Sequence, residues 1–398
     1  MNILRLLGAA SSAIALLSAC TTSTPAETSG PGGAGGTSAS SSATSSGTGG
    51  SGGAESTSAA WSAAAGRSFG KVALAAAGSE GAVAYVESGA PDSNGVFDSI
   101  IKLQRLDASG AVRGAAVDLG QVTSSADPSV TLASDGSRYL ACWDDAKAGK
   151  IACALAPAAN GASVPALALP GLWPSLVYSA GAWTMAYGSP GHAAIAHVSD
   201  DGQALGTPTL FSVTASLPPR TLVAVTAGGF VLVSAPDFDT GTTTLVHLLD
   251  GAFEPLGAPI DLGMKRWLRD AVALAVNGPK IAVSIPEPYG SHLFVLEGGA
   301  IASMHSINFA SKGGPEVALT ADGTSFGELE QADGPGPLNY VTLAGDALIA
   351  TPQAPESDLP LMFSYSTIDL TRIGDHLLFA ATVGQLRDGL IVARVHRP

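Results

Sequence analysis

Short apolar segments and glycine turns alternate along most of the chain. An apolar segment, a glycine turn and a second apolar segment recur at Val130 to Trp143, Leu176 to Tyr187, Leu222 to Ser234 and Val317 to Leu329. Segments of this length, bounded by glycine, predict β-strands joined in hairpins. Long stretches with the 3.6-residue spacing of a helix are missing from the sequence. The pattern therefore disfavours parallel α/β folds, which need crossover helices.

The hairpins belong to a repeat with a nearly constant period. Successive units begin 44 to 56 residues apart when their starts are placed at Val72, Pro128, Pro174, Pro219, Ala271, Pro315 and Leu361. A period of about 40–50 residues with several short strands in each unit is typical of β-propeller blades. Proline fits these starts because the first residue of a strand tolerates it. The pattern predicts an all-β domain over residues 61–398, a β-propeller of seven four-stranded blades.

Two departures from the period carry structural expectations. The first interval is long because residues Gly89 to Asp98 form an inserted loop. The last unit lacks an outer strand of its own before Pro398. We therefore expect the stretch from Trp61 to Gly70 to supply that strand and to close the ring.

One unit resembles a known repeat. It contains Pro128-Ser129-Val130, Asp135-Gly136-Ser137 and Tyr139-Leu140-Ala141-Cys142-Trp143-Asp144, with a later Gly161. These motifs resemble the bacterial secreted propeller repeat, in which a proline and an apolar strand are followed by an Asp-Gly turn and a Tyr-Leu strand with Trp and Asp. The other units are degenerate versions, in which Trp143 is replaced by Tyr187 or by an aliphatic residue. The resemblance implies a propeller and no particular activity.

The N-terminus carries an export signal. Residues 1–20 contain Arg5, an apolar stretch from Leu6 to Leu17 that is too short to span a bilayer, and the sequence Leu17-Ser18-Ala19-Cys20. These last four residues resemble a bacterial lipobox. The resemblance implies that Cys20 receives a diacylglycerol and that the preceding signal peptide is removed. Thr21, where an aspartate would favour the inner membrane, favours the outer membrane in the sorting rule of that family. We expect a lipid-anchored protein of the cell envelope, facing the periplasm or the surface.

The composition separates a tether from a folded domain. Residues 21–60 consist almost entirely of Ser, Thr, Gly and Ala, with Glu27 and Glu55 as the only charged residues. Such a segment buries too little apolar surface to fold, so we predict a disordered tether. The whole chain is 46% hydrophobic and 13% charged, which excludes disorder throughout. Its net charge of -14 argues against a basic face for nucleic acid.

Two cysteines remain once Cys20 is assigned to lipidation. Cys142 and Cys153 flank a turn centred near Lys147 and Ala148. Two antiparallel strands that meet at this turn place the cysteines opposite each other. In an oxidising envelope we expect such a pair to form a disulfide, with two buried free thiols as the alternative. The spacing is not that of a zinc site.

One face of the predicted propeller gathers the candidate binding residues. The loops between the second and third strands of each blade share this face with the loops between blades. It would present Trp173, Arg266, Trp267 and Arg269 from the loops between blades, and Asp144 and Asp145 from a loop within a blade. Aromatic and arginine anchors dominate interface energies, so these residues form the predicted binding surface. Packing of the tryptophans between blades is the alternative.

The acidic loops of the same face raise the question of a metal. Asp92-x-Asn94-Gly95 and Asp237-x-Asp239-x-Gly241 hold oxygen ligands at alternating positions, as a loop-bound Ca²⁺ would need. Both lack the full series of ligands found in calcium loops. Solvated loop charge is the preferred interpretation, and we predict no metal and no cofactor apart from the lipid on Cys20.

The sequence offers little catalytic chemistry. The two G-x-S-x-G matches, at Gly66 to Gly70 and Gly323 to Gly327, lack the strand-to-helix turn of a nucleophile elbow. We therefore expect a monomeric, non-catalytic module that binds or scaffolds a protein or a glycan, without a nucleic-acid partner. The alternative is a glycan-active enzyme that uses the central mouth of the propeller. That enzyme needs convergent carboxylates, and Glu328 with Glu330, on one strand face, are the only close pair.

Overall fold

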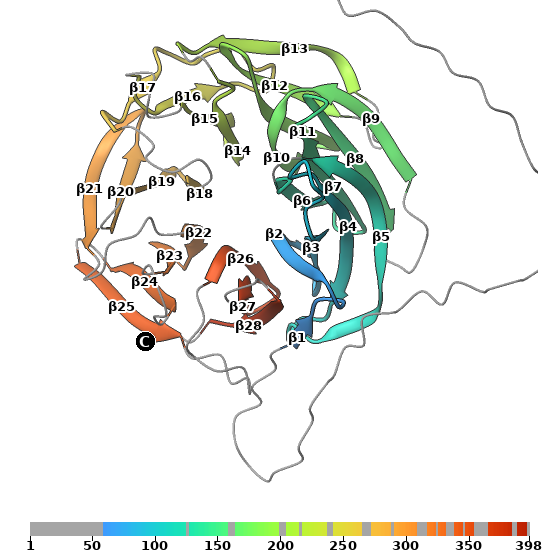
Figure 1. Ribbon diagram of the computed structural model, residues 1–398. Helices are drawn as coiled ribbons and strands as arrows, with labels where there is room; N and C mark the ends of the chain where they lie inside the picture. The colour runs from blue at the N-terminus through green and yellow to red at the C-terminus, as the bar shows by residue number, and fades with distance from the viewer. Residues whose placement is uncertain are drawn as a thin grey trace, which may run out of the picture. The chain divides into compact units, whose positions relative to one another are not determined.

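The fold is a ring of antiparallel sheets. A computed structural model describes residues 59–124, 127–157, 164–198, 204–214, 217–236, 242–264, 272–287, 290–308, 317–323, 325–331, 338–344, 347–353, 365–383 and 388–395. These residues form seven sheets of four strands each, so the predicted β-propeller of seven four-stranded blades is confirmed. Figure 1 looks along the axis of the ring and shows the blades arranged around it.

The blades follow the chain in order. Blade 1 contains β2 (Arg67–Ala77), β3 (Glu80–Gly89), β4 (Phe97–Leu106) and β5 (Val112–Ser124), and blade 2 contains β6 (Val130–Ser134), β7 (Arg138–Asp145), β8 (Lys150–Pro157) and β9 (Val164–Pro170). Blade 3 contains β10 (Leu172–Ser179), β11 (Ala182–Ser189), β12 (His192–Val198) and β13 (Ala204–Ser212), and blade 4 contains β14 (Arg220–Thr226), β15 (Gly229–Ala235), β16 (Leu245–Leu249) and β17 (Ile260–Asp261). Blade 5 contains β18 (Ala273–Asn277), β19 (Lys280–Glu287), β20 (Gly290–Glu297) and β21 (Ala300–Asn308), and blade 6 contains β22 (Val317–Asp322), β23 (Ser325–Gln331), β24 (Leu338–Ala344) and β25 (Ala347–Gln353). Blade 7 contains β26 (Tyr365–Ile373), β27 (His376–Val383), β28 (Gly389–Arg394) and β1 (Ala59–Ser62).

The first strand of the domain closes the ring. β1 pairs antiparallel with β28, with Trp61 opposite Leu390, and so completes blade 7 from the other end of the chain (Figure 1). The expected closure is confirmed for Trp61 and Ser62, whereas Arg67 to Gly70 belong to β2. The strand also begins at Ala59, inside the segment expected to be disordered, because residues 59 and 60 find ladder partners on β28.

The hydrophobic core is divided into layers between blades. Among the described residues, seven apolar clusters each join two neighbouring blades. β7 shows how one strand serves two of them: Tyr139 and Trp143 pack towards blade 1, while Leu140 and Cys142 pack towards blade 3. Side chains alternate between the faces of a strand, and here both faces are covered. This explains the continuous apolar segments of the sequence.

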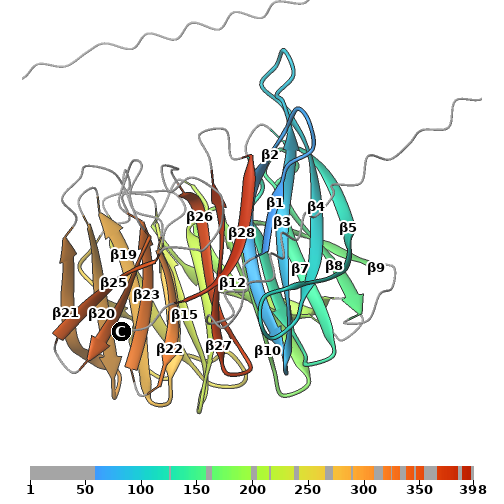
Figure 2. The ribbon, with the colours of Figure 1, turned by 90° about the horizontal axis from the view of Figure 1, so that it is seen from below.

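The hairpin turns follow the sequence pattern. In blade 2 the turn between β6 and β7 contains Asp135 and Gly136, the Asp135 carboxylate accepts hydrogen bonds from the backbone N–H of Ser137 and Arg138, and Gly136 has a φ of +94°. A residue with a side chain is strained at such an angle. The inserted loop expected between Gly89 and Asp98 joins β3 to β4, and Figure 2 shows it extending beyond the ends of the neighbouring strands.

The two cysteines of the domain meet as expected. Cys142 on β7 pairs directly with Cys153 on β8 in the antiparallel ladder. Their sulfur atoms lie 2.09 Å apart, as in a disulfide. The prediction that the turn near Lys147 and Ala148 places the two cysteines opposite each other is therefore confirmed.

The predicted signal peptide, Cys20 and the tether up to residue 58 lie outside the described residues. Within the described ranges, no helix has the length and apolar character needed to cross a bilayer.

Candidate functional site

The innermost strands of the blades enclose a cavity on the axis of the ring. It has a volume of about 210 Å³. Its walls are residues of the innermost strands β2, β6, β10, β14, β18, β22 and β26, together with Ser129 and Val272, which directly precede β6 and β18. Each of these strands runs away from the face where the loops between blades lie. Most of the lining residues lie in the first half of their strands, towards the face that the sequence predicted for binding.

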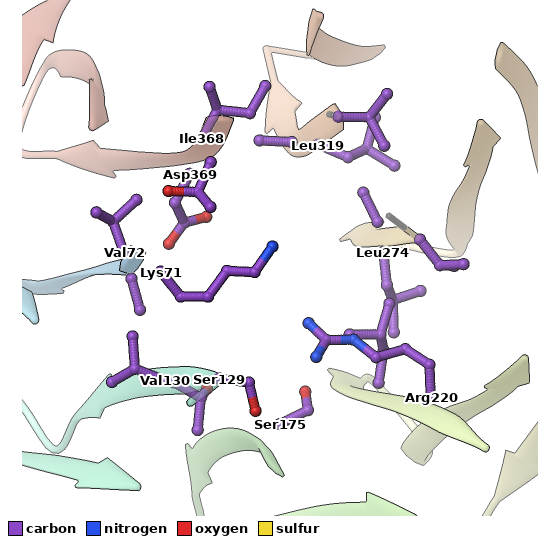
Figure 3. A pocket seen from close by; sticks show the side chains of 18 of the residues that line it. Lys71, Val72, Ser129, Val130, Ser175, Arg220, Leu274, Leu319, Ile368 and Asp369 are labelled. Carbon is purple, nitrogen blue, oxygen red and sulfur yellow. The ribbon is translucent and has the colours of Figure 1, made fainter. Parts of the chain in front are cut away.

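Two cations enter this cavity from different blades. Figure 3 shows the Lys71 side chain and the Arg220 side chain both reaching into it, from blade 1 and from the start of blade 4. The hydroxyls of Ser129 and Ser175 line the same cavity beside them. Two cations and two hydroxyls around one cavity are the donors that an anionic group needs.

Hydrogen bonding leaves some of these donors available. The Ser175 hydroxyl oxygen accepts a hydrogen bond from the backbone N–H of Val223 at 3.1 Å, which leaves its own hydrogen to be donated elsewhere. The Nε of Arg220 is buried, and no hydrogen-bond acceptor for it lies among the residues that the structure describes. Buried donors of this kind are usually satisfied. A ligand oxygen in the cavity would satisfy them.

Asp144 joins two blades through hydrogen bonds, one of them to Ser129 of the cavity wall. Its carboxylate accepts hydrogen bonds from the backbone N–H of Ser129 at 2.8 Å and of Trp173 at 3.0 Å. Burial raises the pKa of Asp144. The two N–H donors and the charge of Arg220 lower it, and the effect of burial is the larger. Asp144 was predicted as a surface contact, but only 3% of it is exposed. Its oxygens are directed to the backbone of its own blade and the next one, which corrects that prediction.

Asp369 plays a similar part where blade 7 meets blade 1. One carboxylate oxygen accepts a hydrogen bond from the backbone N–H of Leu74 at 2.6 Å, and the other accepts one from Leu370 at 2.8 Å. Burial raises the pKa of Asp369 from 3.8 to about 6, against the lowering effect of these N–H donors. Asp369 also lines the cavity, on the same side as Lys71 (Figure 3).

The predicted binding surface is brought together only in part. Trp173 is half-buried, with a φ of +54°, and its backbone joins it to Asp144. Asp145 uses its carboxylate to accept a hydrogen bond from the backbone N–H of Ala148 within its own turn. Arg266, Trp267 and Arg269 lie outside the described residues, as do Asp237 and Asp239 of one possible calcium loop.

The other possible calcium loop has a local explanation. The Asp92 carboxylate accepts hydrogen bonds from the backbone N–H of Asn94 and Val96, and these donors lower the pKa of Asp92. Among the described residues, no group of three or more His, Cys, Asp or Glu side chains is placed to hold a metal ion.

Glu328 and Glu330, the carboxylates of the enzyme alternative, lie away from the cavity. They share one face of β23, as expected, and that face packs on blade 5, where Ser284 and Ser291 donate hydrogen bonds to them. They are 1% and 0% exposed. Burial raises the pKa of both, and the charge of Glu328 raises that of Glu330 further. The pair is therefore a buried contact between blades and not a wall of the cavity.

Four polar residues of the cavity were missed by sequence reasoning. Lys71, Ser129, Ser175 and Arg220 each stand within one residue of a predicted unit start, at Val72, Pro128, Pro174 and Pro219. The first residues of the innermost strands of a propeller surround its axis. A polar side chain at that position of the repeat was the signal that could have found them.

Comparison with protein-family models and with curated proteins finds no match. Solved structures do resemble the domain. The chain is similar to acylaminoacyl peptidase, solved with Z-Gly-Gly-Phe-chloromethyl ketone, at 10% identity and a TM-score of 0.50 over 83% of this chain and 51% of the peptidase chain. It is similar to the β-propeller domain of the Trilobed protease from Pyrococcus furiosus at 9% identity and a TM-score of 0.48, over 83% of this chain and 94% of that one. It is also similar to an Aleuria aurantia lectin mutant solved with Fucα1-6GlcNAc, at 13% identity and a TM-score of 0.43, over 73% of this chain and 97% of the lectin. At such identities the likeness shows the propeller fold alone.

Proposed function

We propose that this protein is a lipid-anchored, non-catalytic binding module of the cell envelope, and that it holds a protein or glycan ligand at the mouth of the central cavity. The observation that carries the proposal is the meeting of Lys71 and Arg220 in one cavity, with two serine hydroxyls beside them. Cations in a partly enclosed site attract an anionic group strongly, because the surroundings screen them less than water does.

The carboxylates near the cavity support binding over catalysis. Asp144 and Asp369 each accept two backbone hydrogen bonds, and each joins neighbouring blades. A general acid or base must instead face the reacting group within hydrogen-bond distance. The bonds of these carboxylates favour a role in holding the ring together.

The envelope location is supported by two separate features. The lipobox resemblance at Cys20 supplies the anchor, since several acyl chains on one residue give stable membrane binding. The Cys142–Cys153 pair fits an oxidising compartment, where disulfides persist. In a cell fractionation, the Cys20→Ala variant should leave the membrane fraction. Unchanged fractionation would refute the anchor and leave the ligand site to be judged separately.

The ligand site is tested by site-specific photocrosslinking in the native envelope. A photoreactive residue at Lys147, in the exposed turn between β7 and β8, lies on the cavity face, and one at Asp375, in the exposed turn between β26 and β27, is the control on the opposite face. We expect a crosslinked ligand from position 147 and none of that product from position 375. The product should be lost when Arg220→Gln is combined with the crosslinker. Equal products from both faces, or a product that Arg220→Gln leaves unchanged, would contradict the proposed function.

A further inference from the structure

The size of the cavity limits what can enter it. Pockets for whole small ligands usually measure about 300–1,000 Å³. The cavity here, at about 210 Å³, is smaller than that range. It therefore accepts the end of a larger ligand, or one side chain of it, while the rest stays outside the mouth.

The charges around the cavity favour a single negative charge on that end group. Lys71 and Arg220 supply two positive charges, and the carboxylates of Asp144 and Asp369 lie close to them. Because carboxylates already stand beside the two cations, a group with one negative charge adds less uncompensated charge to the site than a group with two. A phosphate, with nearly two charges, would leave negative charge uncompensated in a partly buried site.

The geometry of the donors favours a planar group. An arginine guanidinium presents parallel N–H donors that match the two oxygens of a carboxylate. Ser175 offers a further hydroxyl hydrogen from the neighbouring blade, because its oxygen is already occupied by the N–H of Val223. Both features suit the two oxygens of one carboxylate.

Besides the polar side chains of Thr131, Thr367 and Asp369, the remaining wall of the cavity is largely aliphatic. It is formed in part by Val72, Val130, Leu274, Leu319 and Ile368 (Figure 3). A short aliphatic stem behind the carboxylate would pack against these side chains. Ring hydroxyls of an acidic sugar that faced these aliphatic side chains would instead lose their hydrogen bonds to water, which is costly.

We propose that the group bound in the cavity is a carboxylate on a short aliphatic stem, carried by a peptide as its C-terminal residue or as an acidic side chain. This inference rests on the proposed function, because it names the ligand of the same site. Lys71 and Arg220 bind the carboxylate, Ser175 donates to it, and the aliphatic wall packs on the stem.

Calorimetric titration of the full chain tests the proposal with defined probes. The probes are an acetylated Ala-Ala-Val peptide with a free C-terminal carboxylate, the same peptide as its C-terminal amide, an acetylated Ala-Glu-Ala amide, glucuronate and inorganic phosphate. We expect binding of the two peptides that carry a carboxylate, and binding at least about tenfold weaker for the neutral amide. Arg220→Gln should weaken carboxylate binding by about tenfold or more, since a hydrogen-bonded charge is lost. Arg220→Lys keeps the charge and loses the paired donors, so it should bind the carboxylate peptides more weakly than the unmodified chain and more tightly than Arg220→Gln.

A charge-matched control separates the site from general electrostatics. Arg113 lies on the outermost strand of blade 1 with 51% of its side chain exposed, where it pairs with Glu80, so Arg113→Gln should leave binding unchanged. Thermal melting of each variant checks that it is folded. Even if a variant is unfolded, the probe series on the unmodified chain shows which chemical group the cavity binds. Glucuronate or phosphate as the tightest probe, equal binding of acid and amide, or no binding of any peptide would overturn the assignment.

The two proposals can fail separately. If crosslinking at position 147 depends on Arg220 but the carboxylate peptides do not compete with it, the binding module stands and the peptide carboxylate is wrong. If crosslinking does not depend on Arg220, both proposals fall together.

Discussion

Asp369 gives the sharpest prediction, because its partly buried carboxylate joins blade 7 to blade 1 through a backbone hydrogen bond. Its pKa is raised from 3.8 to about 6 by burial, against the lowering effect of the N–H donors of Leu74 and Leu370. A shift of about two units corresponds to roughly 3 kcal/mol. Since the pKa is higher in the folded chain than in the unfolded one, the protonated form favours folding. The stability that this group contributes is present below about pH 4 and is lost as the pH rises through about 6.

The test compares the full chain with its Asp369→Asn variant. Asparagine cannot ionise, and its carbonyl can still accept the hydrogen bond from Leu74. The free energy of unfolding is measured in urea at several pH values between 4 and 8. The free energy of unfolding of the variant minus that of the unmodified chain should rise by about 3 kcal/mol over this range. It should level off above about pH 7. Asp375→Asn, at an exposed turn of the same blade, is the control and should show no such rise.

A flat or falling difference would refute this reasoning. A flat difference would mean that folding leaves the pKa of Asp369 unchanged. A falling difference would mean that its ionised carboxylate is stabilised in the folded chain, with Lys71, which reaches into the same cavity, as the candidate cation. The proposed balance of charges in the cavity would then have to be revised as well.

Two further predictions concern contacts between and within blades. The Cys142–Cys153 pair closes a loop with a sequence separation of 11 residues, so replacing both by Ala should lower the free energy of unfolding by about 3 kcal/mol; mass spectrometry should show a gain of two hydrogens on reduction, and an unchanged mass would show free thiols. Gly188 lies against the Pro219 carbonyl at the start of blade 4, so the methyl group of Gly188→Ala would collide with backbone. Such overpacking costs about 1–3 kcal/mol or more, and here it should also displace Arg220 and weaken ligand binding. Gly228→Ala, where nothing lies within 4 Å, is the matched control in urea unfolding and in titration, and an equal effect of both substitutions would contradict the proposed contact.

The alternative function as a glycan-active enzyme depended mainly on Glu328 and Glu330, and these two residues do not line the cavity. Glu328 and Glu330 do share a strand face, as the two-residue spacing predicts. Which way that face points depends on the position of β23 in its blade, and it packs on blade 5. The spacing of two residues therefore gave the right local geometry and no information about the cavity.

The local and repeating features of the chain were set by the sequence. The alternation of apolar segments and glycine turns fixed the hairpins, the period of the units fixed the seven blades, and the turn at Lys147 and Ala148 placed Cys142 opposite Cys153. The missing outer strand of the last unit predicted closure by the N-terminal segment, which β1 provides. All of these depend on neighbours within one hairpin or on counting equal units, and both can be read along a chain.

The candidate site was decided by tertiary structure alone. Lys71 lies inside the inner strand of blade 1 and Arg220 begins that of blade 4, and the ring brings them into one cavity although blades 2 and 3 lie between them in the sequence. Asp144 looks like a loop residue in the sequence, yet the start of the next blade covers it and supplies its hydrogen-bond donors. The physical reason is that every inner strand looks alike in its own sequence, while its orientation towards the axis exists only once the seven blades have closed.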